Sequence, residues 1–540
     1  TYMVTSNQAD GGGSVTVYPN DFPSLNRKQR ITLDPSTISS DDRVIIPPIT
    51  AIKEREVIHQ RYPRLWQLSR EMEIDQILYP TDSTAKPLGF VTSGLSYTYL
   101  EHALHILGLS GRFPILKLGI TYPIDPEMIQ RFAEHAQTFC IVEEKRPFIE
   151  PQFATELSRR KDLGVNLCGK VFPGGEPGFS DVQGLDPSLV IQGLARLFAA
   201  LDTDLSIDDQ KLQAELATLT PAPSTVTVPA RTPSFCPGCP HRDSASVLKK
   251  TSADLADPPA GQDPLELVFH GDIGCYSMLK YAPFSDLMHN LSGMGLGGGT
   301  GAGIDPFIDN KQLVFMGDST FFHTGMIAIS DSIKNGQDIT YIILDNKTTA
   351  MTGHQPTPGA NLDILGQPTF AQDIEKIVRG LAGDSSVFIA RMNPAVRQEY
   401  ANLVRETLSR DGVKIIIADK ECGITYHRRQ RAQQSALAKE RGFLPVENHI
   451  NIDEDVCEFC LECTQATGCS GLTVNPNTSY GSKVAIDLSS CVSDGACTRV
   501  EVGDGDKTCP SFEEITIYRQ AAPTTQFPPI KVGELPEPEF

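Results

Sequence analysis

Short apolar runs alternate with helix-like patterns over two long parts of the chain. Runs at 89–92 and 139–142 predict buried strands, and residues 97–107 have the pattern of a helix. Such alternation is typical of parallel sheets flanked by helices. A second region of the same kind has four predicted strands, at 267–269, 313–316, 341–344 and 414–417. The chain is therefore predicted to be α/β, with two parallel-sheet domains followed by a small α+β module rich in cysteine.

The domain boundaries follow from shifts in this pattern and in composition. The predicted α/β domains span 85–200 and 234–425, and the Cys-rich module spans 450–518. The stretch 220–233 is rich in Pro and Thr and predicts a linker. An N-terminal connecting segment is expected at 1–84, with a polar helix over 52–73 and loops at 11–13 and 18–21. Linkers are expected at 201–233 and 426–449, and a Pro-rich tail at 519–540.

The charge and the apolar runs exclude several classes of protein. The 47 basic and 67 acidic residues leave a net charge of −20, which argues against a nucleic-acid partner. No apolar run approaches the roughly 18 residues that a membrane span needs. The first residues lack a basic region followed by an apolar core, so we expect no secretory signal and a cytoplasmic protein. The absence of Met at position 1 predicts a processed or truncated beginning.

The 13 cysteines are unevenly distributed. Only Cys140 and Cys168 lie in the first 230 residues, whereas seven lie between Cys457 and Cys509. A secreted disulfide framework would spread its cysteines through a small domain. Cysteines grouped at spacings of two or three residues instead indicate ligation of a metal or an iron–sulfur cluster in a reducing compartment.

Polar residues follow two of the predicted strands. Gly317-Asp318-Ser319 ends one strand, and Asn346 ends the next, after a predicted crossover helix over 320–335. A right-handed crossover places the carboxyl ends of parallel strands side by side, where ligands bind. Mg²⁺ prefers oxygen ligands, which the Asp318 carboxylate, the Asn346 amide and a main-chain carbonyl near Thr348 would supply. Gly-Asp-Ser alone is a common turn, so the prediction depends on the pairing with the second strand end.

Four longer motifs resemble the thiamine-diphosphate-dependent indolepyruvate:ferredoxin oxidoreductases. They are Phe235-Cys-Pro-Gly-Cys-Pro-His-Arg242, Gly271-Asp-Ile-Gly-Cys-Tyr276, Gly317-Asp-Ser-Thr-Phe-Phe-His323 and Thr348-Thr-Ala-Met-Thr-Gly-His-Gln-Pro356. Val142-Glu-Glu-Lys-Arg-Pro147 resembles a segment of that family's preceding, transketolase C-terminal-like domain. The resemblance covers about residues 85–518. In the Gly-rich run 293–299 the backbone can approach a ligand closely. Together with this run, the resemblance implies a binding site for thiamine diphosphate and Mg²⁺. Its residues would be Gly271, Asp272, Cys275, Tyr276, Gly295, Gly317, Asp318, Ser319, Asn346, Thr348 and Thr352.

The family also has a pyrimidine-binding domain upstream, whose Glu activates the thiamine. No such domain is recognisable in residues 1–80. We therefore expect a partner chain or an upstream segment to supply it, and we expect the protein to be oligomeric.

Cys236, Cys239, Cys275 and Cys422 form a candidate metal site near this crevice. Four thiolates hold either tetrahedral zinc or a [4Fe–4S] cluster, and spacing alone favours zinc. The resemblance favours a cluster, because related 2-oxoacid oxidoreductases place one beside the thiamine.

The C-terminal module contains a ferredoxin-like pattern. Cys457-x2-Cys460-x2-Cys463 has the form of a bacterial ferredoxin run, and Cys509-Pro510 has the form of its end. In two-cluster ferredoxins the last Cys of each run serves the other cluster. This rule assigns Cys457, Cys460, Cys463 and Cys509 to one cluster. The second cluster is assigned to Cys469, Cys491 and Cys497. Asp494 would be its fourth ligand, or would lie beside an open corner that favours a three-iron form. The alternative interpretation of the whole module is a Cys-rich zinc module.

Three histidines are candidate acid–base residues. His241, His323 and His354 lie within the motifs, although a lone His is more often structural than catalytic. His323 is predicted to open a helix, whose dipole would keep it neutral.

The resemblance implies oxidative decarboxylation of a 2-oxoacid, such as indolepyruvate or another aryl pyruvate, to an acyl-CoA and CO₂. Coenzyme A would be the co-substrate, and [4Fe–4S] clusters would carry electrons to a ferredoxin-like acceptor. Two alternatives stay open. One is a non-catalytic electron-transfer subunit, against which Asp318 and Asn346 argue. The other is a non-redox thiamine-dependent decarboxylase, against which the cysteines argue.

Overall fold

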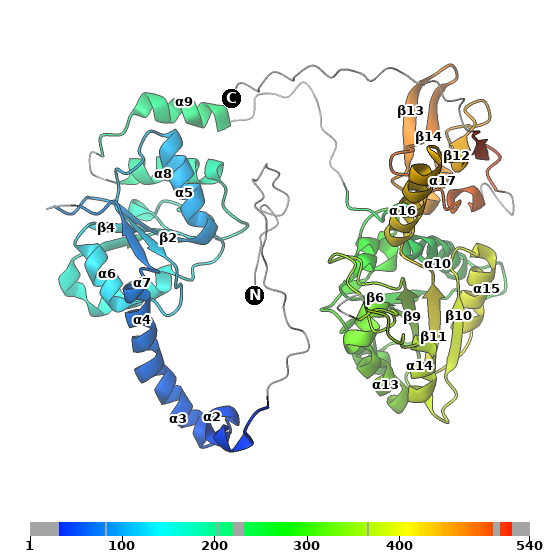
Figure 1. Ribbon diagram of the computed structural model, residues 1–540, viewed down its shortest axis with the longest axis horizontal. Helices are drawn as coiled ribbons and strands as arrows, with labels where there is room; N and C mark the ends of the chain where they lie inside the picture. The colour runs from blue at the N-terminus through cyan, green and yellow to red at the C-terminus, as the bar shows by residue number, and fades with distance from the viewer. Residues whose placement is uncertain are drawn as a thin grey trace. The chain divides into compact units, whose positions relative to one another are not determined.

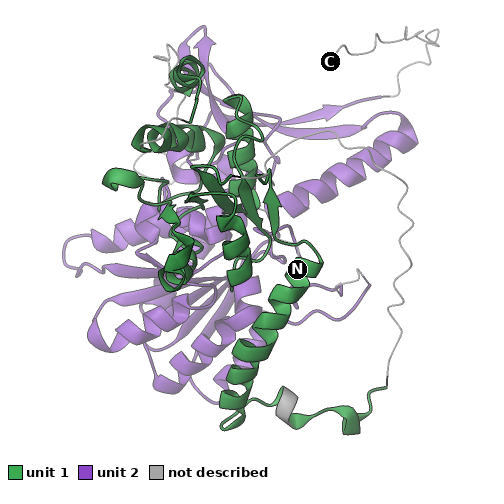
Figure 2. Ribbon diagram, turned by 90° about the vertical axis from the view of Figure 1, so that its left-hand side faces the viewer, with its two compact units in different colours: residues 1–227 green, residues 228–540 purple. Residues whose placement is uncertain are grey.

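The computed structural model describes residues 32–81, 84–201, 205–219, 232–363, 367–500 and 508–520. The chain divides into two compact units, residues 1–227 and 228–540, which Figure 2 colours separately. The loops predicted near residues 11–21, most of the 220–233 linker and the tail from 521 lie outside the described residues. The polar helix predicted over 52–73 is confirmed as a continuous helical run of α3 (Ile49–Glu56), η2 (Val57–Arg61) and α4 (Tyr62–Glu71).

Unit 1 contains a five-stranded sheet in the order β1-β3-β2-β4-β5 (Figure 1). Strands β2 to β5 are parallel, which confirms the prediction, and β1 adds an antiparallel edge strand. The edge strand was not predicted because it has three residues and is only partly buried. The strands are β1 (Gln76–Leu78), β2 (Gly89–Ser93), β3 (Ile115–Leu118), β4 (Thr138–Val142) and β5 (Asn166–Cys168).

Helices cover both faces of this sheet because side chains alternate between its faces. Phe90 packs in a core with α5, α8 and α9, whereas its neighbour Val91 packs in a second core with α6 and α7. Unit 1 is therefore a three-layer α/β domain. Its helices are α5 (Gly94–Ile106), α6 (Pro126–Ala133), α7 (Glu150–Arg159), α8 (Pro187–Ala200) and α9 (Asp209–Leu219).

Unit 2 contains a six-stranded parallel sheet in the order β10-β11-β9-β8-β6-β7. The four predicted strands are confirmed as β6, β8, β9 and β11. The short β7 and the half-buried β10 were not predicted. The bounds are β6 (Leu267–Gly271), β7 (Asn290–Leu291), β8 (Lys311–Gly317), β9 (Ile339–Asp345), β10 (Phe388–Met392) and β11 (Lys414–Asp419).

The helices of unit 2 also lie on both faces of its sheet (Figure 1). One core joins α10 and α15 to the sheet, and the other joins α13 and α14 to it. The predicted crossover helix is confirmed as a helical run from Asp318 to Asn335, which ends at the left-handed Gly336. The helices are α10 (Pro240–Ala256), α11 (Gly297–Ile304), α12 (Asp318–Thr320), η8 (Phe321–Gly325), α13 (Met326–Asn335), α14 (Ile374–Ala382) and α15 (Arg397–Leu408).

The Cys-rich module contains two small antiparallel sheets. β12 (Val446–Ile452) pairs with β15 (Phe512–Tyr518), and β13 (Leu472–Thr478) pairs with β14 (Gly481–Ile486). Helix α17 (Glu462–Thr467) lies among its cysteines.

The prediction of a linker at 426–449 is wrong in part, because α16 (Gly423–Arg441) is helical over 19 residues and β12 begins at Val446. Helix α16 has no apolar stripe, and only Gly423 is buried in it, so periodicity gave no signal for it.

Short helices complete the described structure: η1 (Pro35–Thr37), α2 (Ser40–Arg43), η3 (Lys161–Leu163), η4 (Pro173–Gly175), η5 (Cys275–Lys280), η6 (Ser285–Leu287), η7 (Asp305–Phe307) and η9 (Cys497–Arg499). No helix within the described ranges combines the length and the apolar composition that a membrane span requires.

Packing around Phe139 should dominate the stability of unit 1. Phe139 is fully buried, with its ring 4.8 Å from that of Phe132 and 6.1 Å from that of Phe153 between centroids. Phe139→Ala should lower the free energy of unfolding by about 3–5 kcal/mol, since the cavity left behind cannot be filled. Urea unfolding followed by the fluorescence of Trp66, the single tryptophan, measures this loss. In the control, Phe148→Ala, the ring removed is 56% exposed; an equal loss in both variants would contradict the placement of Phe139.

Candidate cofactor site and cysteine groups

The candidate residues follow four parallel strands that end at one edge of the unit 2 sheet. Cys275 follows β6, Asp318 follows β8, Asn346 follows β9 and Cys422 follows β11. The strands are paired in parallel register, so their carboxyl ends lie side by side. Residues separated by up to 147 positions in the sequence are thereby brought to one place.

A cavity of about 70 Å³ lies at this edge. It is lined by nine of the residues predicted for the site: His241, Cys275, Tyr276, Gly317, Asp318, Ser319, Asn346, Thr348 and Thr352.

Three other predicted positions, Gly271, Asp272 and Gly295, lie behind the cavity rather than on its wall. The Asp272 carboxylate accepts hydrogen bonds from the Tyr276 hydroxyl and, at 3.1 Å, from the Gly295 backbone N–H. Burial raises the pKa of Asp272 to about 6. A side chain at Gly297 would meet the Gly271 carbonyl carbon at 3.0 Å. Asp272 therefore fixes the Gly-rich loop against the end of β6.

Asp318 has the properties of a cation ligand. It is 2% exposed, its Oδ1 accepts from the Ser319 N–H at 2.8 Å, and its Oδ2 has no hydrogen-bond partner in the described structure. Burial and the nearby charge of Asp345 raise the pKa of Asp318 to about 7. An unpartnered buried carboxylate oxygen is costly, and a divalent cation would remove that cost.

His241 orients the second candidate ligand, Asn346. Burial lowers the pKa of His241 to about 4, so the ring is neutral near pH 7. Its Nε2 lies 3.2 Å from the Asn346 Nδ2, which can only donate, so Nε2 accepts and the ring proton is assigned to Nδ1. The Asn346 Oδ1 accepts from the Thr348 N–H at 3.2 Å and keeps a second lone pair for a cation.

The three predicted histidines have different environments. Only His241 lines the 70 Å³ cavity. His323 is exposed and lies one turn into the helical run, within η8, so the prediction that it opens the helix is wrong. His354 lies beside the cysteines, and its Nδ1 is 3.2 Å from the Thr425 hydroxyl.

Cys236, Cys239, Cys275 and Cys422 all line a second cavity of about 260 Å³. His241, Cys275 and Asn346 line both cavities, so the two share a wall. Burial and the neighbouring thiols of Cys422 and Cys236 raise the pKa of Cys275 to about 11. The predicted convergence of the four cysteines is therefore observed, although their ligation of a metal stays a prediction.

The spacing of these thiols bears on the choice between zinc and a cluster. Four sulfurs bound to one zinc at 2.3 Å lie about 3.8 Å apart. Within the described part of the chain, no three His, Cys, Asp or Glu side chains converge on a single-ion position. The four cysteines lie on the wall of one cavity of about 260 Å³. The ligand set itself, four thiolates, is one that both tetrahedral zinc and a [4Fe–4S] cluster use.

The seven cysteines of the C-terminal module lie in the two predicted groups, whereas Cys140 and Cys168 are buried in the core of unit 1. Burial and the thiols of Cys509, Cys460 and Cys457 raise the pKa of Cys463 to about 11, so these four are neighbours. The second group lines a third cavity of about 20 Å³ with Arg242, and its members are Cys469, Cys491, Asp494 and Cys497.

Asp494 faces these sulfurs but is already ion-paired. Its Oδ2 accepts from the Lys420 ammonium at 3.1 Å, and the same ammonium lies 2.5 Å from Asp243. Burial opposes ionisation of Asp494, but the charges of Lys420 and Arg242 hold its pKa below the usual value. Lys420 therefore competes with any iron for this carboxylate. This ion-pair network was not predicted; its only signal in the sequence is the pair of charged residues, Arg242 and Asp243, after the C-P-G-C-P-H motif.

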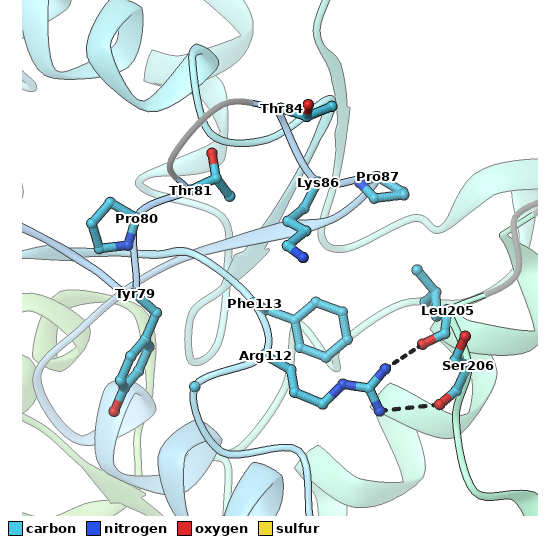
Figure 3. Close-up of a pocket in the computed structure, with 11 residues that line it drawn as sticks. Tyr79, Pro80, Thr81, Thr84, Lys86, Pro87, Arg112, Phe113, Leu205 and Ser206 are labelled. Carbon is cyan, nitrogen blue, oxygen red and sulfur yellow. Dashed lines mark hydrogen bonds between the residues drawn. The ribbon is translucent and has the colours of Figure 1, made fainter.

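A larger cavity, of about 630 Å³, lies in unit 1 and contains none of the predicted site residues (Figure 3). Lys86 and Arg112 line it, and Arg112 donates to the carbonyls of Leu205 and Ser206 at 2.9 and 3.0 Å.

Two domain families match the chain. Residues 272–418 match the thiamine pyrophosphate enzyme, C-terminal TPP binding domain, and residues 80–225 match the indolepyruvate oxidoreductase domain. The first match contains the crevice at the ends of β6, β8 and β9. The second coincides with the α/β domain of unit 1.

The chain is similar to the indolepyruvate oxidoreductase subunits IorA of two archaea. It is 28% identical to that of Archaeoglobus fulgidus over 84% of this chain and 64% of the relative. It is also 28% identical to that of Methanothermobacter marburgensis over 79% of this chain and 61% of the relative. The matched region thus spans less than two thirds of these relatives. A solved 2-oxoglutarate:ferredoxin oxidoreductase from Magnetococcus marinus matches 37% of this chain and 70% of its own chain. The sequence identity is 17% and the TM-score is 0.31, so this structural similarity is weak.

Ionisation of Asp318 should control cation binding. Its pKa is raised to about 7, and Mg²⁺ needs the ionised carboxylate. Affinity for Mg²⁺ with thiamine diphosphate should therefore fall as the pH decreases below about 7, approaching tenfold per pH unit. Calorimetric titration across this range measures the profile. The exposed control, Asp331→Asn, should keep this profile, whereas Asp318→Asn should remove the dependence; a flat profile in the unmodified chain would contradict the role of Asp318.

Proposed function

We propose that this chain, which is similar to indolepyruvate oxidoreductase subunits, is the thiamine-diphosphate-binding and electron-carrying part of a 2-oxoacid:ferredoxin oxidoreductase. The observation that carries the proposal is the shared wall of two cavities. One contains a buried carboxylate with an unpartnered oxygen, and the other is lined by four cysteines. A cofactor site and an electron exit are needed side by side in this reaction.

The chain's residues have distinct tasks in the proposed reaction. Asp318, Asn346 and the backbone near Thr348 would hold Mg²⁺ and, through it, the diphosphate. His241 keeps the Asn346 amide oriented, and Asp272 holds the Gly-rich loop in place. When bound, thiamine diphosphate supplies the chemistry by which a 2-oxoacid loses CO₂. The cysteines at 236, 239, 275 and 422 would hold a [4Fe–4S] cluster that takes the electrons away.

The C-terminal module would carry the electrons further. Its two groups of cysteines match the crossed pattern of two-cluster ferredoxins. We propose a [4Fe–4S] cluster at Cys457, Cys460, Cys463 and Cys509. A second cluster, with three or four irons, would lie at Cys469, Cys491 and Cys497, and a ferredoxin-like protein would be the acceptor.

The substrates and partners follow from the family. The 2-oxoacid would be an aryl pyruvate such as indolepyruvate, and the acyl group would pass to coenzyme A. Residues 32–81 form helices and the edge strand of the unit 1 sheet, and they contain no separate α/β domain. A partner chain or a further segment would therefore supply the pyrimidine-binding domain. The cysteines would have to be reduced to bind metal, which fits a reducing, cytoplasmic environment.

The first test concerns retention of thiamine diphosphate. Asp318→Ala removes the only carboxylate on the wall of the 70 Å³ cavity, so cofactor content should fall by more than about tenfold, as for loss of a charged ligand. Iron content should stay unchanged because the cysteines are untouched. Asp331→Ala, at an exposed position of α13, is the control. Normal cofactor content in Asp318→Ala would remove the basis of the proposed site.

The second test concerns the fourth position of the Cys469 group. A carboxylate is a harder ligand than a thiolate and is here ion-paired with Lys420. Asp494→Cys should therefore convert a three-iron signal to a four-iron signal in electron paramagnetic resonance. Thr473→Cys, which places a thiol at an exposed position of β13, should leave the signal unchanged. The crossed-ferredoxin assignment fails if Asp494→Cys alters neither the signal nor the iron content.

A further inference from the structure

The turn from Cys236 to Cys239 separates two cysteine-lined cavities. Its two cysteines line the 260 Å³ cavity, whereas Pro237 and Gly238 line the 20 Å³ cavity. The backbone approaches the C-terminal module closely here, since a side chain at Gly238 would meet Cγ2 of Val492 at 2.5 Å. One turn of backbone therefore divides the thiamine-side cysteines from the Cys469 group.

Arg242 lies next to this turn, three residues after Cys239 on α10. It is 2% exposed and lines the 20 Å³ cavity with Cys469, Cys491 and Cys497. Its Nη2 donates to Asp243 at 3.1 Å, but its Nη1 has no hydrogen-bond partner among the residues described. A buried N–H of a guanidinium is costly without an acceptor. The acceptors on this cavity wall are the sulfurs of the three cysteines and the Asp494 carboxylate, which is already paired with Lys420.

The charges around Arg242 leave this donor uncommitted. Lys420 is held by two carboxylates, Asp243 at 2.5 Å and Asp494 at 3.1 Å. Arg242 has one carboxylate partner, Asp243, which it shares with Lys420. The two cations and two anions balance, so a negative charge added in the cavity would face the unpartnered side of Arg242. Arginine stays protonated at any physiological pH, so this charge is fixed.

We propose that Arg242 sets the reduction potential of the iron–sulfur cluster held by Cys469, Cys491 and Cys497, by donating its Nη1–H to a cluster sulfur. This inference rests on the proposed function, because it requires a cluster at these cysteines. Reduction adds one electron to the cluster and changes no bond or proton on Arg242. The fixed positive charge favours the reduced cluster, and so draws electrons across the Cys236–Cys239 turn into the C-terminal module.

The test is a redox titration of the full chain, with each cluster followed by electron paramagnetic resonance. Arg242→Met keeps a side chain of similar length without the charge. At fixed potential the ratio of reduced to oxidised cluster should fall about tenfold, which corresponds to ~59 mV for one electron. The control, Arg499→Met, removes an exposed charge two residues from Cys497 and should leave the potential unchanged.

A second variant decides the matter if Arg242→Met does not assemble the cluster. Asp243→Asn keeps Arg242 but removes the anion that offsets it, so the potential of the same cluster should rise. An unchanged potential in iron-loaded Arg242→Met, or an unchanged or lower one in Asp243→Asn, would overturn the role of Arg242 and leave the proposed function intact. Absence of an iron–sulfur signal from this site in the unmodified chain would overturn both the inference and the electron-carrying part of the proposed function.

Discussion

The parallel pairing of β6, β8, β9 and β11 is the constraint on which the rest of the site depends. Because these strands run in one direction and are joined through helices, everything that follows their carboxyl ends meets at one edge. The residues immediately beyond those ends include a carboxylate, an amide and two thiols. The sheet core behind them is fully buried, so the backbone that carries these groups is held rigidly.

The same constraint explains why binding groups at this edge would stabilise the protein. Asp318 is buried with one oxygen unpartnered, and burial raises the pKa values of the Cys236, Cys239 and Cys275 thiols. Ionising any of these groups without a cation costs free energy. A bound metal ion or cluster reverses that cost, so cofactor binding and stability of unit 2 are linked. The ion pairs of Lys420 extend this linkage to the C-terminal module.

The sequence predicted those parts of the fold and site that depend on local pattern. Long apolar strands such as β8 and β9 were recognisable, and the positions of Asp318 and Asn346 after them followed from topology. The C-x2-C spacing identified the cysteines as candidate metal ligands.

Helix α16 was not predicted because it has no apolar stripe, and β10 was not predicted because it is only half buried. The contact between Lys420 and Asp243 joins residues 177 positions apart, and no local pattern encodes it. His323 lies in a motif, yet its side chain is exposed, because a motif does not fix which face of a helix is buried.

Metal and cofactor analysis of the anaerobically purified chain, together with its partner chains, tests the central claim most directly. Three clusters predict about 11–12 iron atoms and about 12 acid-labile sulfides per chain. Magnesium and thiamine diphosphate should be present at about one each per chain, with no zinc at Cys236, Cys239, Cys275 and Cys422. Zinc bound by these four cysteines, or a preparation that contains iron but retains no thiamine diphosphate with its partners present, would contradict the account.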